Sequence, residues 1–160
     1  MISTNKIWKE LSTIPDPEIP VISIVELGVL RGVNYKNKGL HITITPTYSG
    51  CPAMNQIEND IAKKLIELGI ENYQINLQYH PAWTTDWMTE KAKTKLLEYG
   101  ISPPDNSVDK SGLLGEAKKT LCPNCKSRNT KMVSQFGSTA CKALHQCNDC
   151  MEPYDYFKCI

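Results

Sequence analysis

The fold is decided by residues 41–69, which read HITITPTYSGCPAMNQIENDIAKKLIELG. Ile42 and Ile44 alternate with threonines, and this period of two predicts a half-buried strand. After the Ser-Gly turn, apolar residues recur every three or four positions from Met54 to Leu68, which predicts a helix that ends at Gly69. The chain therefore passes from strand to helix through one tight turn.

Cys51 lies in this turn. Proline is favoured at the first helical position, so Pro52 puts Cys51 at about the N-cap, beside unpaired backbone N–H groups. Because the helix dipole favours a thiolate there, we expect the pKa of this thiol to be lowered, and a thiolate is both a nucleophile and a metal ligand. Cys51 is therefore a candidate functional thiol, and a small packing residue is the alternative.

Three strands are expected around this helix. Residues 29–35 and 40–45 have strand patterns, and the Lys-Asn-Lys-Gly sequence between them predicts a hairpin. Residues 73–79 alternate apolar and polar side chains, and a right-handed crossover through the helix would make this strand parallel to the second one. The expected fold is an α/β (α+β) domain with helices and a small three-stranded mixed sheet.

Two carboxylates lie on a stiff loop near the N-terminus. A short helix capped by Ser3 or Thr4 is followed by residues 14–20, where three prolines predict a rigid, extended segment. Asp16 and Glu18 lie on this segment as candidate supporting acids. Two acids without a nearby histidine are also consistent with caps of the neighbouring backbone or with side chains in water.

A loop and a linker follow the third strand. His80 and Trp83 lie in the loop and either line a binding surface beside Cys51 or, in the case of the tryptophan, cover the core. A helical pattern runs over residues 88–99. Residues 103–119 are polar and punctuated by proline and glycine, which is typical of a linker.

The C-terminal residues 120–160 carry two Cys-x-x-Cys pairs separated by 21 residues. Four thiolates at this spacing can bind one tetrahedral ion, so we expect a zinc ribbon with three short strands, and iron is the alternative metal. So short a module buries too little apolar surface to fold alone, so the metal would hold it folded. The expected ligands are Cys122, Cys125, Cys147 and Cys150.

Cys141 and Cys159 fall outside this ligand spacing. Cys141 is interpreted as a structural residue, with a substitute ligand or a reactive thiol as alternatives. Cys159 is second from the end of the sequence, so it does not form a prenylation box.

Composition excludes several classes of protein. The 160 residues have a formal net charge of +1, so there is no global field to attract nucleic acid or an acidic membrane. No apolar run approaches the roughly 18 residues of a membrane span, and the first residues lack the pattern of a signal peptide. We expect a cytoplasmic protein, in which seven cysteines are more suited to metal binding or reactive thiols than to disulfides.

Several separated motifs carry a resemblance to known families. Asp16-Pro-Glu-Ile-Pro20, Val25-Glu-Leu-Gly28 and the segment from Thr45 through Pro52 resemble the iron–sulfur assembly domains that include SufT and the eukaryotic cytosolic iron–sulfur targeting factor. With the motifs at residues 81–88 and 99–104 and the cysteine-rich segment, the whole chain resembles the PaaD family, also named PaaJ. The resemblance implies a SufT-like domain over residues 1–102, a linker over 103–119 and a zinc ribbon over 120–160.

The resemblance also implies a role for particular residues. In the assembly-domain family, the cysteine that matches Cys51 is the functional thiol, and Asp16 and Glu18 match the acidic motif. A transient iron–sulfur cluster or iron at Cys51 is the implied cofactor.

For the whole chain, the resemblance implies an accessory protein of the multicomponent phenylacetyl-CoA epoxidase, which performs ring 1,2-epoxidation in aerobic phenylacetate degradation. The implied task is iron–sulfur cluster assembly or maintenance in a partner, above all the iron–sulfur reductase. The assembly machinery and the other epoxidase subunits are further expected partners, and a homodimer is left open. The sequence lacks Glu-x-x-His pairs and a Gly-rich dinucleotide loop, so we expect no catalysis by this chain alone.

Three alternatives remain open at this point. These alternatives are a stoichiometric structural subunit of the epoxidase, a nucleic-acid-binding zinc ribbon, and a thiol enzyme that uses Cys51. The balanced charge disfavours the second, although the ribbon holds four basic residues, and the missing paired base disfavours the third. These basic residues are Lys126, Arg128, Lys131 and Lys142.

Overall fold

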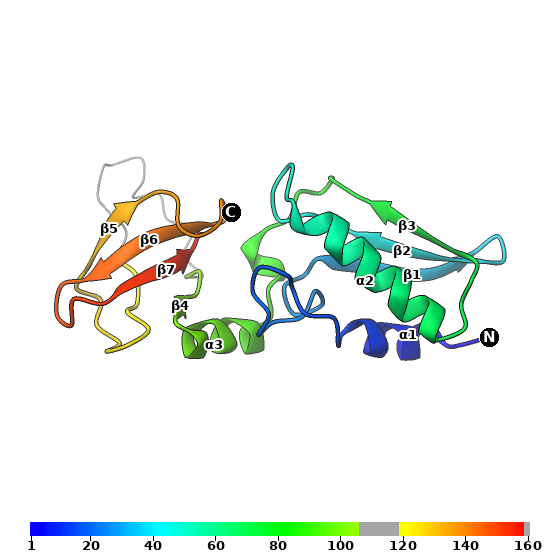
Figure 1. Ribbon diagram of the computed structural model, residues 1–160, viewed down its shortest axis with the longest axis horizontal. Helices are drawn as coiled ribbons and strands as arrows, with labels where there is room; N and C mark the ends of the chain where they lie inside the picture. The colour runs from blue at the N-terminus through cyan, green and yellow to red at the C-terminus, as the bar shows by residue number, and fades with distance from the viewer. Residues whose placement is uncertain (106–118, 159–160) are drawn as a thin grey trace. The chain divides into compact units, whose positions relative to one another are not determined.

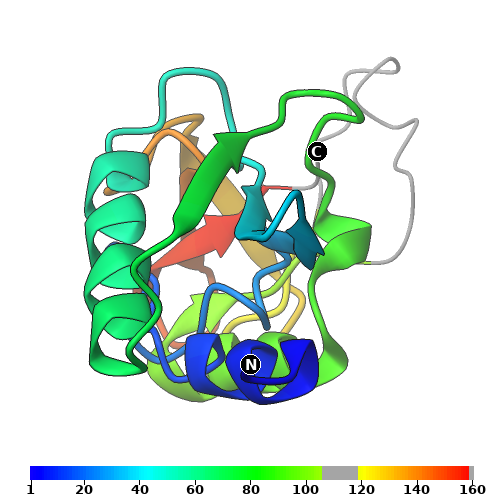
Figure 2. The ribbon, with the colours of Figure 1, turned by 90° about the vertical axis from the view of Figure 1, so that its right-hand side faces the viewer.

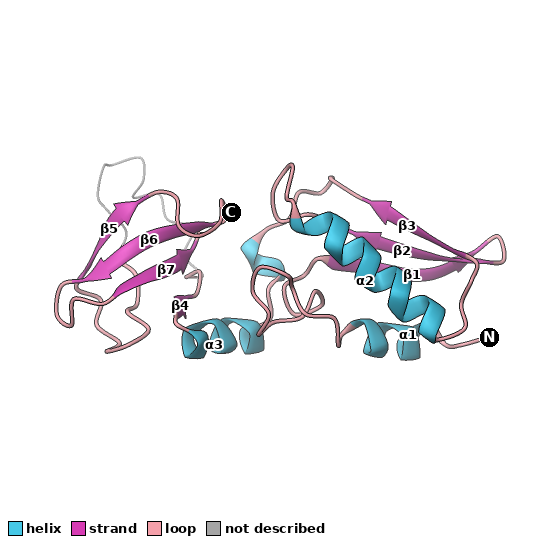
Figure 3. Ribbon diagram, in the orientation of Figure 1, coloured by secondary structure: helices cyan, strands magenta, loops and turns pink. Residues whose placement is uncertain are grey.

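The computed structural model describes residues 1–105 and 119–158, and the chain divides into two compact units, Met1–Thr89 and Glu90–Ile160. Figure 1 follows the chain by colour, and Figure 3 shows its helices and strands. No helix in the described part of the chain is both long and apolar enough to cross a bilayer.

The first unit contains the expected three-stranded mixed sheet. Its strand order is β1-β2-β3, with β1 antiparallel to β2 and β2 parallel to β3. The fold class expected from the sequence is therefore confirmed. The elements are α1 (Thr4–Leu11), β1 (Leu30–Lys36), β2 (Gly39–Ile44), α2 (Ala53–Glu67), β3 (Tyr73–Leu77) and a 3-10 helix (Thr85–Trp87).

Local turn chemistry fixes the register of this sheet. Asn37 and Lys38 both have positive φ angles, of 49° and 65°, as a two-residue hairpin turn of type I′ requires. This turn pairs Lys36 with Gly39 and so sets the whole β1–β2 ladder. The crossover through α2 then returns the chain so that β3 lies parallel to β2.

The core of the first unit lies between the sheet and the helices. Helix α2 lies across one face of the sheet, as two perpendicular views show (Figures 1 and 2). The buried face of α2 consists of residues at helical spacing, and the facing strand residues Leu40, Ile42 and Ile44 have no exposed surface. Ser3 caps α1 by accepting a hydrogen bond from the backbone N–H of Lys6, at 3.3 Å.

The Glu26-Leu27-Gly28 turn holds the loop that follows β3. The Trp83 indole N–H donates to the Leu27 carbonyl at 2.9 Å, and Trp83 is only 2% exposed. Gly28 has a φ of +82°, and a Cβ there would lie 2.8 Å from the Trp87 carbonyl oxygen, so only glycine fits. Trp83 is therefore part of the core, and the alternative in which it lines a binding surface is wrong.

The second unit contains the three expected ribbon strands and one strand that was not expected. Its sheet has the order β4-β7-β6-β5, in which β4 lies parallel to β7 and the other pairs are antiparallel. The elements are α3 (Glu90–Tyr99), β4 (Ile101–Ser102), β5 (Thr130–Ser134), β6 (Lys142–Cys147) and β7 (Pro153–Phe157).

Strand β4 brings residues 90–102 into the second unit, whereas the sequence-based division left them in the first. Two residues are too short to show a strand period, so the pairing of Ser102 with Tyr156 has no signature in the sequence. Most of the expected linker, residues 106–118, lies outside the described residues.

Candidate metal centre and functional thiol

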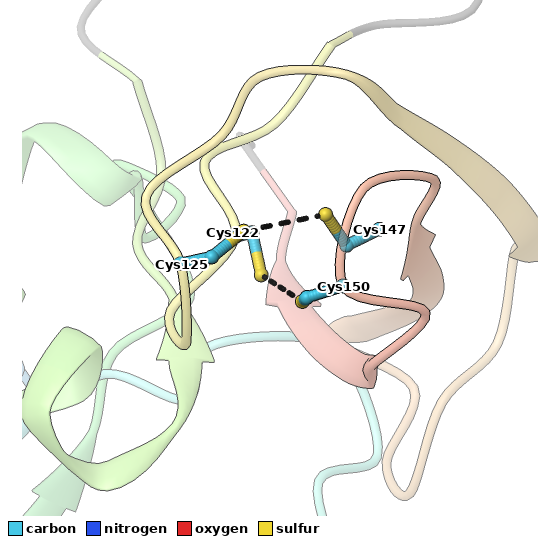
Figure 4. A group of neighbouring side chains, drawn as sticks. All are labelled: Cys122, Cys125, Cys147 and Cys150. Atoms are coloured by element: carbon cyan, nitrogen blue, oxygen red, sulfur yellow. Dashed lines mark hydrogen bonds between the residues drawn. The ribbon is translucent and has the colours of Figure 1, made fainter.

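The four cysteines of the two Cys-x-x-Cys pairs form one cluster (Figure 4). All four sulfur atoms lie within 4.8 Å of one another, with 3.7 Å between the sulfurs of Cys122 and Cys150 and 3.5 Å between those of Cys125 and Cys147. A tetrahedral ion with bonds of about 2.3 Å separates its sulfur ligands by about 3.8 Å. The cluster therefore has the size and the donor type of a tetrahedral metal centre.

The two cysteine pairs fold as matching knuckles. In the first, the Cys122 N–H donates to the Ser127 carbonyl at 2.9 Å, and in the second the Cys147 N–H donates to the Glu152 carbonyl at 3.0 Å. The residue after the second cysteine of each knuckle has a left-handed backbone, with a φ of 63° at Lys126 and 64° at Met151. We call this second cysteine the outer cysteine of its knuckle and the first one the inner cysteine. Neither residue is glycine or asparagine, so this feature could not be recognised in the sequence.

Burial differs between the inner and outer ligands. Cys122 and Cys147, the first cysteine of each knuckle, have no exposed surface, whereas Cys150 is half-buried and Cys125 is exposed. Tyr154 packs against this cluster. The inner sulfurs thus belong to the core of the ribbon, whereas burial constrains the outer sulfurs less.

A buried polar network backs the cluster and was not predicted from the sequence. The Thr120 hydroxyl lies 2.6 Å from the Tyr154 hydroxyl and 3.2 Å from Nδ1 of His145, all inside the second unit. The Thr120 N–H also donates to the Thr130 hydroxyl at 3.1 Å. Because these residues are scattered over 35 positions, from 120 to 154, no local motif could have signalled them.

Two thiols of the cluster, Cys125 and Cys150, have pKa values shifted in opposite directions. The Glu152 backbone and, more weakly, Asn124 and the neighbouring thiols donate to Cys150, and they lower its pKa to about 7 against the effect of burial. At Cys125, a hydrogen bond from the Ser127 backbone favours the thiolate, but some loss of solvation and hydrogen bonds with the other three sulfurs raise the pKa to about 12. An ion that binds all four sulfurs must therefore displace protons, so its affinity rises with pH.

The other cysteine of this unit stays apart from the cluster. Cys141 is 3% exposed, and its sulfur lies 3.0 Å from the Thr139 hydroxyl. It does not belong to the group of sulfurs that could share an ion, so it is not a substitute ligand in the described structure. Cys159 lies outside the described residues.

In the first unit, Cys51 lies one residue further from the helix than expected. Pro52 is the N-cap of α2, the helix begins at Ala53, and the cap makes no side-chain hydrogen bond. The expected N-cap position of Cys51 is therefore wrong. The sulfur still accepts a hydrogen bond from the Ala53 backbone, so one of the unpaired N–H groups does face it.

The surroundings raise the pKa of the Cys51 thiol. Burial is the largest cause, and the negative charge of Glu18 acts in the same direction. Hydrogen bonds from Ala53, Tyr48 and Thr47 favour the thiolate but do not outweigh burial. The expectation of a lowered pKa is therefore wrong, because a half-buried thiol loses more solvation than the helix N-terminus returns.

The two acids of the proline-rich loop have different environments. Asp16 is only 6% exposed, and its Oδ1 accepts hydrogen bonds from the backbone N–H groups of Glu18, at 2.9 Å, and Ile19, at 2.8 Å. Asp16 therefore caps the loop, as the backbone-cap alternative predicted. Glu18 instead lies close enough to Cys51 for its charge to act on the thiol.

The structure brings Glu18, Thr47 and Tyr48 to Cys51. Sequence reasoning missed the roles of Thr47 and Tyr48, although both are polar residues within the quoted turn. His80 is exposed, and nothing in the described residues joins it to Cys51.

Two families match separate parts of the chain. Residues 4–73 match a family described as iron-sulfur cluster assembly protein, and residues 106–158 match one described as PaaD zinc beta ribbon domain. The crystal structure of a domain of unknown function, DUF59, from Bacillus anthracis has a TM-score of 0.54 and 32% sequence identity, and the match covers 58% of this chain and 90% of that one.

Some relatives match only part of this chain, and another matches nearly all of it. YitW of Bacillus subtilis (strain 168), named as an Fe-S protein maturation auxiliary factor, is 36% identical over 58% of this chain and 91% of its own length. A protein of Escherichia coli (strain K12), named as a 1,2-phenylacetyl-CoA epoxidase subunit, is 50% identical over 98% of this chain and 93% of its own length. Because that match spans both units, the chain belongs to the PaaD family of phenylacetyl-CoA epoxidase subunits.

Proposed function

We propose that this chain is an accessory protein of a phenylacetyl-CoA epoxidase system in aerobic phenylacetate degradation, and that it acts in the cytoplasm. Its task is to assist iron–sulfur cluster assembly or maintenance in a partner, most directly the iron–sulfur reductase. The observation that carries this proposal is one chain that joins an assembly-type domain, with Cys51 at its helix α2, to a family-specific ribbon.

Cys51 is the residue that would hold the iron or cluster to be delivered, which is a substrate here and not a resident cofactor. Its thiol is protonated at rest, because burial raises its pKa, and it loses the proton when a cation binds. The carboxylate of Glu18, which opposes a bare thiolate, favours a cation held between the two groups. Hydrogen bonds from Ala53, Tyr48 and Thr47 then stabilise the sulfur in its anionic form.

For the four-cysteine cluster, we propose one structural zinc ion. Four thiolates at tetrahedral spacing suit zinc, and iron is the alternative because it accepts the same donors. Elemental analysis of the purified chain tests the assignment: about one zinc per chain is expected, and iron without zinc in anaerobically prepared protein would overturn it.

The test of the delivery function is a Cys51→Ser variant that replaces the natural chain in cells growing on phenylacetate. Serine keeps the size of the side chain but is a much poorer iron ligand, so we expect growth to fail. The reductase polypeptide should persist while its iron–sulfur absorbance is lost. Cys141→Ser is the control for a cysteine-to-serine change, because it removes a buried thiol that lies outside the cluster.

Normal growth with Cys51→Ser, together with a fully loaded reductase, would contradict the proposal. The naming of the Escherichia coli relative as an epoxidase subunit favours a second candidate, a stoichiometric structural component. Copurification with the epoxidase at a fixed ratio through turnover, with a reductase that is loaded in its absence, would support that second candidate.

A further inference from the structure

The two knuckles are joined by contacts that do not involve their cysteines. The β5–β6 ladder ends at the pair Thr130 and Cys147. Thr130 begins β5 and follows the first knuckle, and Cys147 ends β6 and begins the second knuckle. One more backbone bond continues the ladder, from the Asn148 N–H to the Asn129 carbonyl at 2.8 Å. Beyond that bond, side-chain hydrogen bonds link the first knuckle to the second.

Asp149 makes most of these side-chain links. Its Oδ1 accepts from the Asn129 side-chain amide at 2.7 Å, and its Oδ2 accepts from the Ser127 hydroxyl. The Asn148 amide donates to the Asn129 side-chain oxygen at 3.1 Å, and the Ser127 hydroxyl accepts from the Asn129 backbone at 3.0 Å. We call Ser127, Asn129, Asn148 and Asp149 the clasp.

The clasp acts where the core does not. Cys122 and Cys147 are fixed by complete burial, but Cys125 is exposed and Cys150 is half-buried. Asp149 directly precedes Cys150, and Ser127 follows Cys125 by two residues. A link between Asp149 and Ser127 therefore fixes the two outer sulfurs relative to each other, which burial cannot do for them.

We propose that Asp149 is a positioning residue of the metal centre, and that the clasp holds the outer sulfurs of the two knuckles at the spacing that one tetrahedral ion needs. This inference rests on the proposed metal site. Residues that orient metal ligands without touching the metal commonly change its affinity by 10–100-fold when they are mutated.

The test uses the full-length chain, from which metal is removed under reducing conditions and to which zinc is returned against a chelating competitor. Asp149→Ala removes both acceptors, and we expect zinc to bind about 10–100-fold more weakly. Asp149→Asn keeps a side-chain oxygen that accepts from the Asn129 amide, and its new N–H group can donate to the Ser127 hydroxyl oxygen. It should therefore restore most of the affinity for zinc. Glu98→Ala, which removes an exposed carboxylate of α3 in the same unit, is the control for loss of charge and should bind like the natural chain.

A second readout reports the geometry of the four sulfur ligands directly. Cobalt bound to four thiolates in a tetrahedral site gives a strong ligand-field absorption, which Asp149→Ala should weaken or shift and Asp149→Asn should retain. Ser127→Ala breaks only one link, and we expect a smaller loss of affinity in the same direction.

The outcomes separate this inference from the proposal on which it rests. If Asp149→Ala binds zinc as tightly as Glu98→Ala, the positioning role is overturned and the metal site stands. Failure of Asp149→Asn to restore affinity also overturns it, because the links and not the charge are proposed to act. If the natural chain binds no zinc or cobalt at one ion per chain, the metal site itself is overturned, and the inference with it.

Discussion

The four-cysteine cluster and the Cys51 site differ in how much of their chemistry could be predicted from the sequence. Two pairs with a two-residue gap were enough to predict that four sulfurs meet, and they lie within 4.8 Å of one another. At Cys51 the sequence located the residue but predicted the wrong direction for its pKa. Spacing within a short loop is local geometry, whereas the pKa of a thiol depends on everything that packs around it.

The two regions also differ in what holds them together. The first unit buries a continuous set of aliphatic side chains from α1, α2 and the sheet. Around the knuckles of the second unit, the buried cluster consists of Cys122, Cys147 and Tyr154, with Cys150 packed against it. Three of the four candidate ligands, Cys122, Cys147 and Cys150, belong to that cluster or pack against it, so loss of a metal there should affect the second unit far more than the first.

The largest expected effect comes from breaking the cluster. Cys125→Ser should abolish stoichiometric zinc binding and unfold the ribbon, because structural zinc supplies about 10–16 kcal/mol in zinc-finger peptides. All three tryptophans, Trp8, Trp83 and Trp87, lie in the first unit, so their fluorescence reports that unit alone. The urea transition of the first unit, followed by tryptophan fluorescence, should therefore stay unchanged, although the ribbon is unfolded and zinc binding is lost.

Cys141→Ser is the control for this comparison, since it changes a largely buried cysteine of the same unit and should keep the zinc. If Cys125→Ser also lost the urea transition of the first unit, the two units would not differ in their need for metal.

A smaller effect is expected at Asp16, where the first unit depends on hydrogen bonds. Asp16→Ala leaves the backbone N–H groups of Glu18 and Ile19 without their acceptor, which should lower the free energy of unfolding by about 2 kcal/mol. Asp16→Asn keeps a side-chain oxygen that can accept both bonds, so its loss should be clearly smaller. Tryptophan fluorescence in urea measures both variants, and equal losses would indicate that the charge of Asp16, and not its acceptor, is what matters.

The smallest effect is expected at Glu18, whose charge raises the pKa of Cys51. Glu18→Gln removes that charge, so the pKa falls, more thiolate is present at neutral pH, and alkylation of Cys51 should become a few-fold faster. The rate profile should shift toward lower pH, as peptide mapping of the alkylated, zinc-loaded chain can measure. Glu71→Gln, at an exposed glutamate before β3, is the matched control. Identical profiles for the two variants would show that Glu18 does not act on the thiol.

Much of the architecture was predictable because it is encoded locally. The period of two in residues 41–45 and the helical spacing from Met54 to Leu68 gave β2 and α2, and the Lys-Asn-Lys-Gly turn gave the hairpin. Strand β4 could not be predicted, because two residues carry no period and its partner β7 lies more than fifty positions away. The role of Trp83 was equally hidden, since its acceptor is the backbone of Leu27, 56 positions earlier.

The sequence by itself determined most of the helices and strands, the mixed sheet of the first unit and the four cysteines of the candidate metal centre, because periodicity, turn chemistry and Cys-x-x-Cys spacing act over a few residues. Only the tertiary structure decided the chemical state of Cys51, the separate roles of Asp16 and Glu18, and the clasp around Asp149. Each of these depends on atoms that distant segments bring within hydrogen-bonding or Coulombic range. Burial and charge at such a meeting point are properties of the folded chain, and no stretch of sequence contains them.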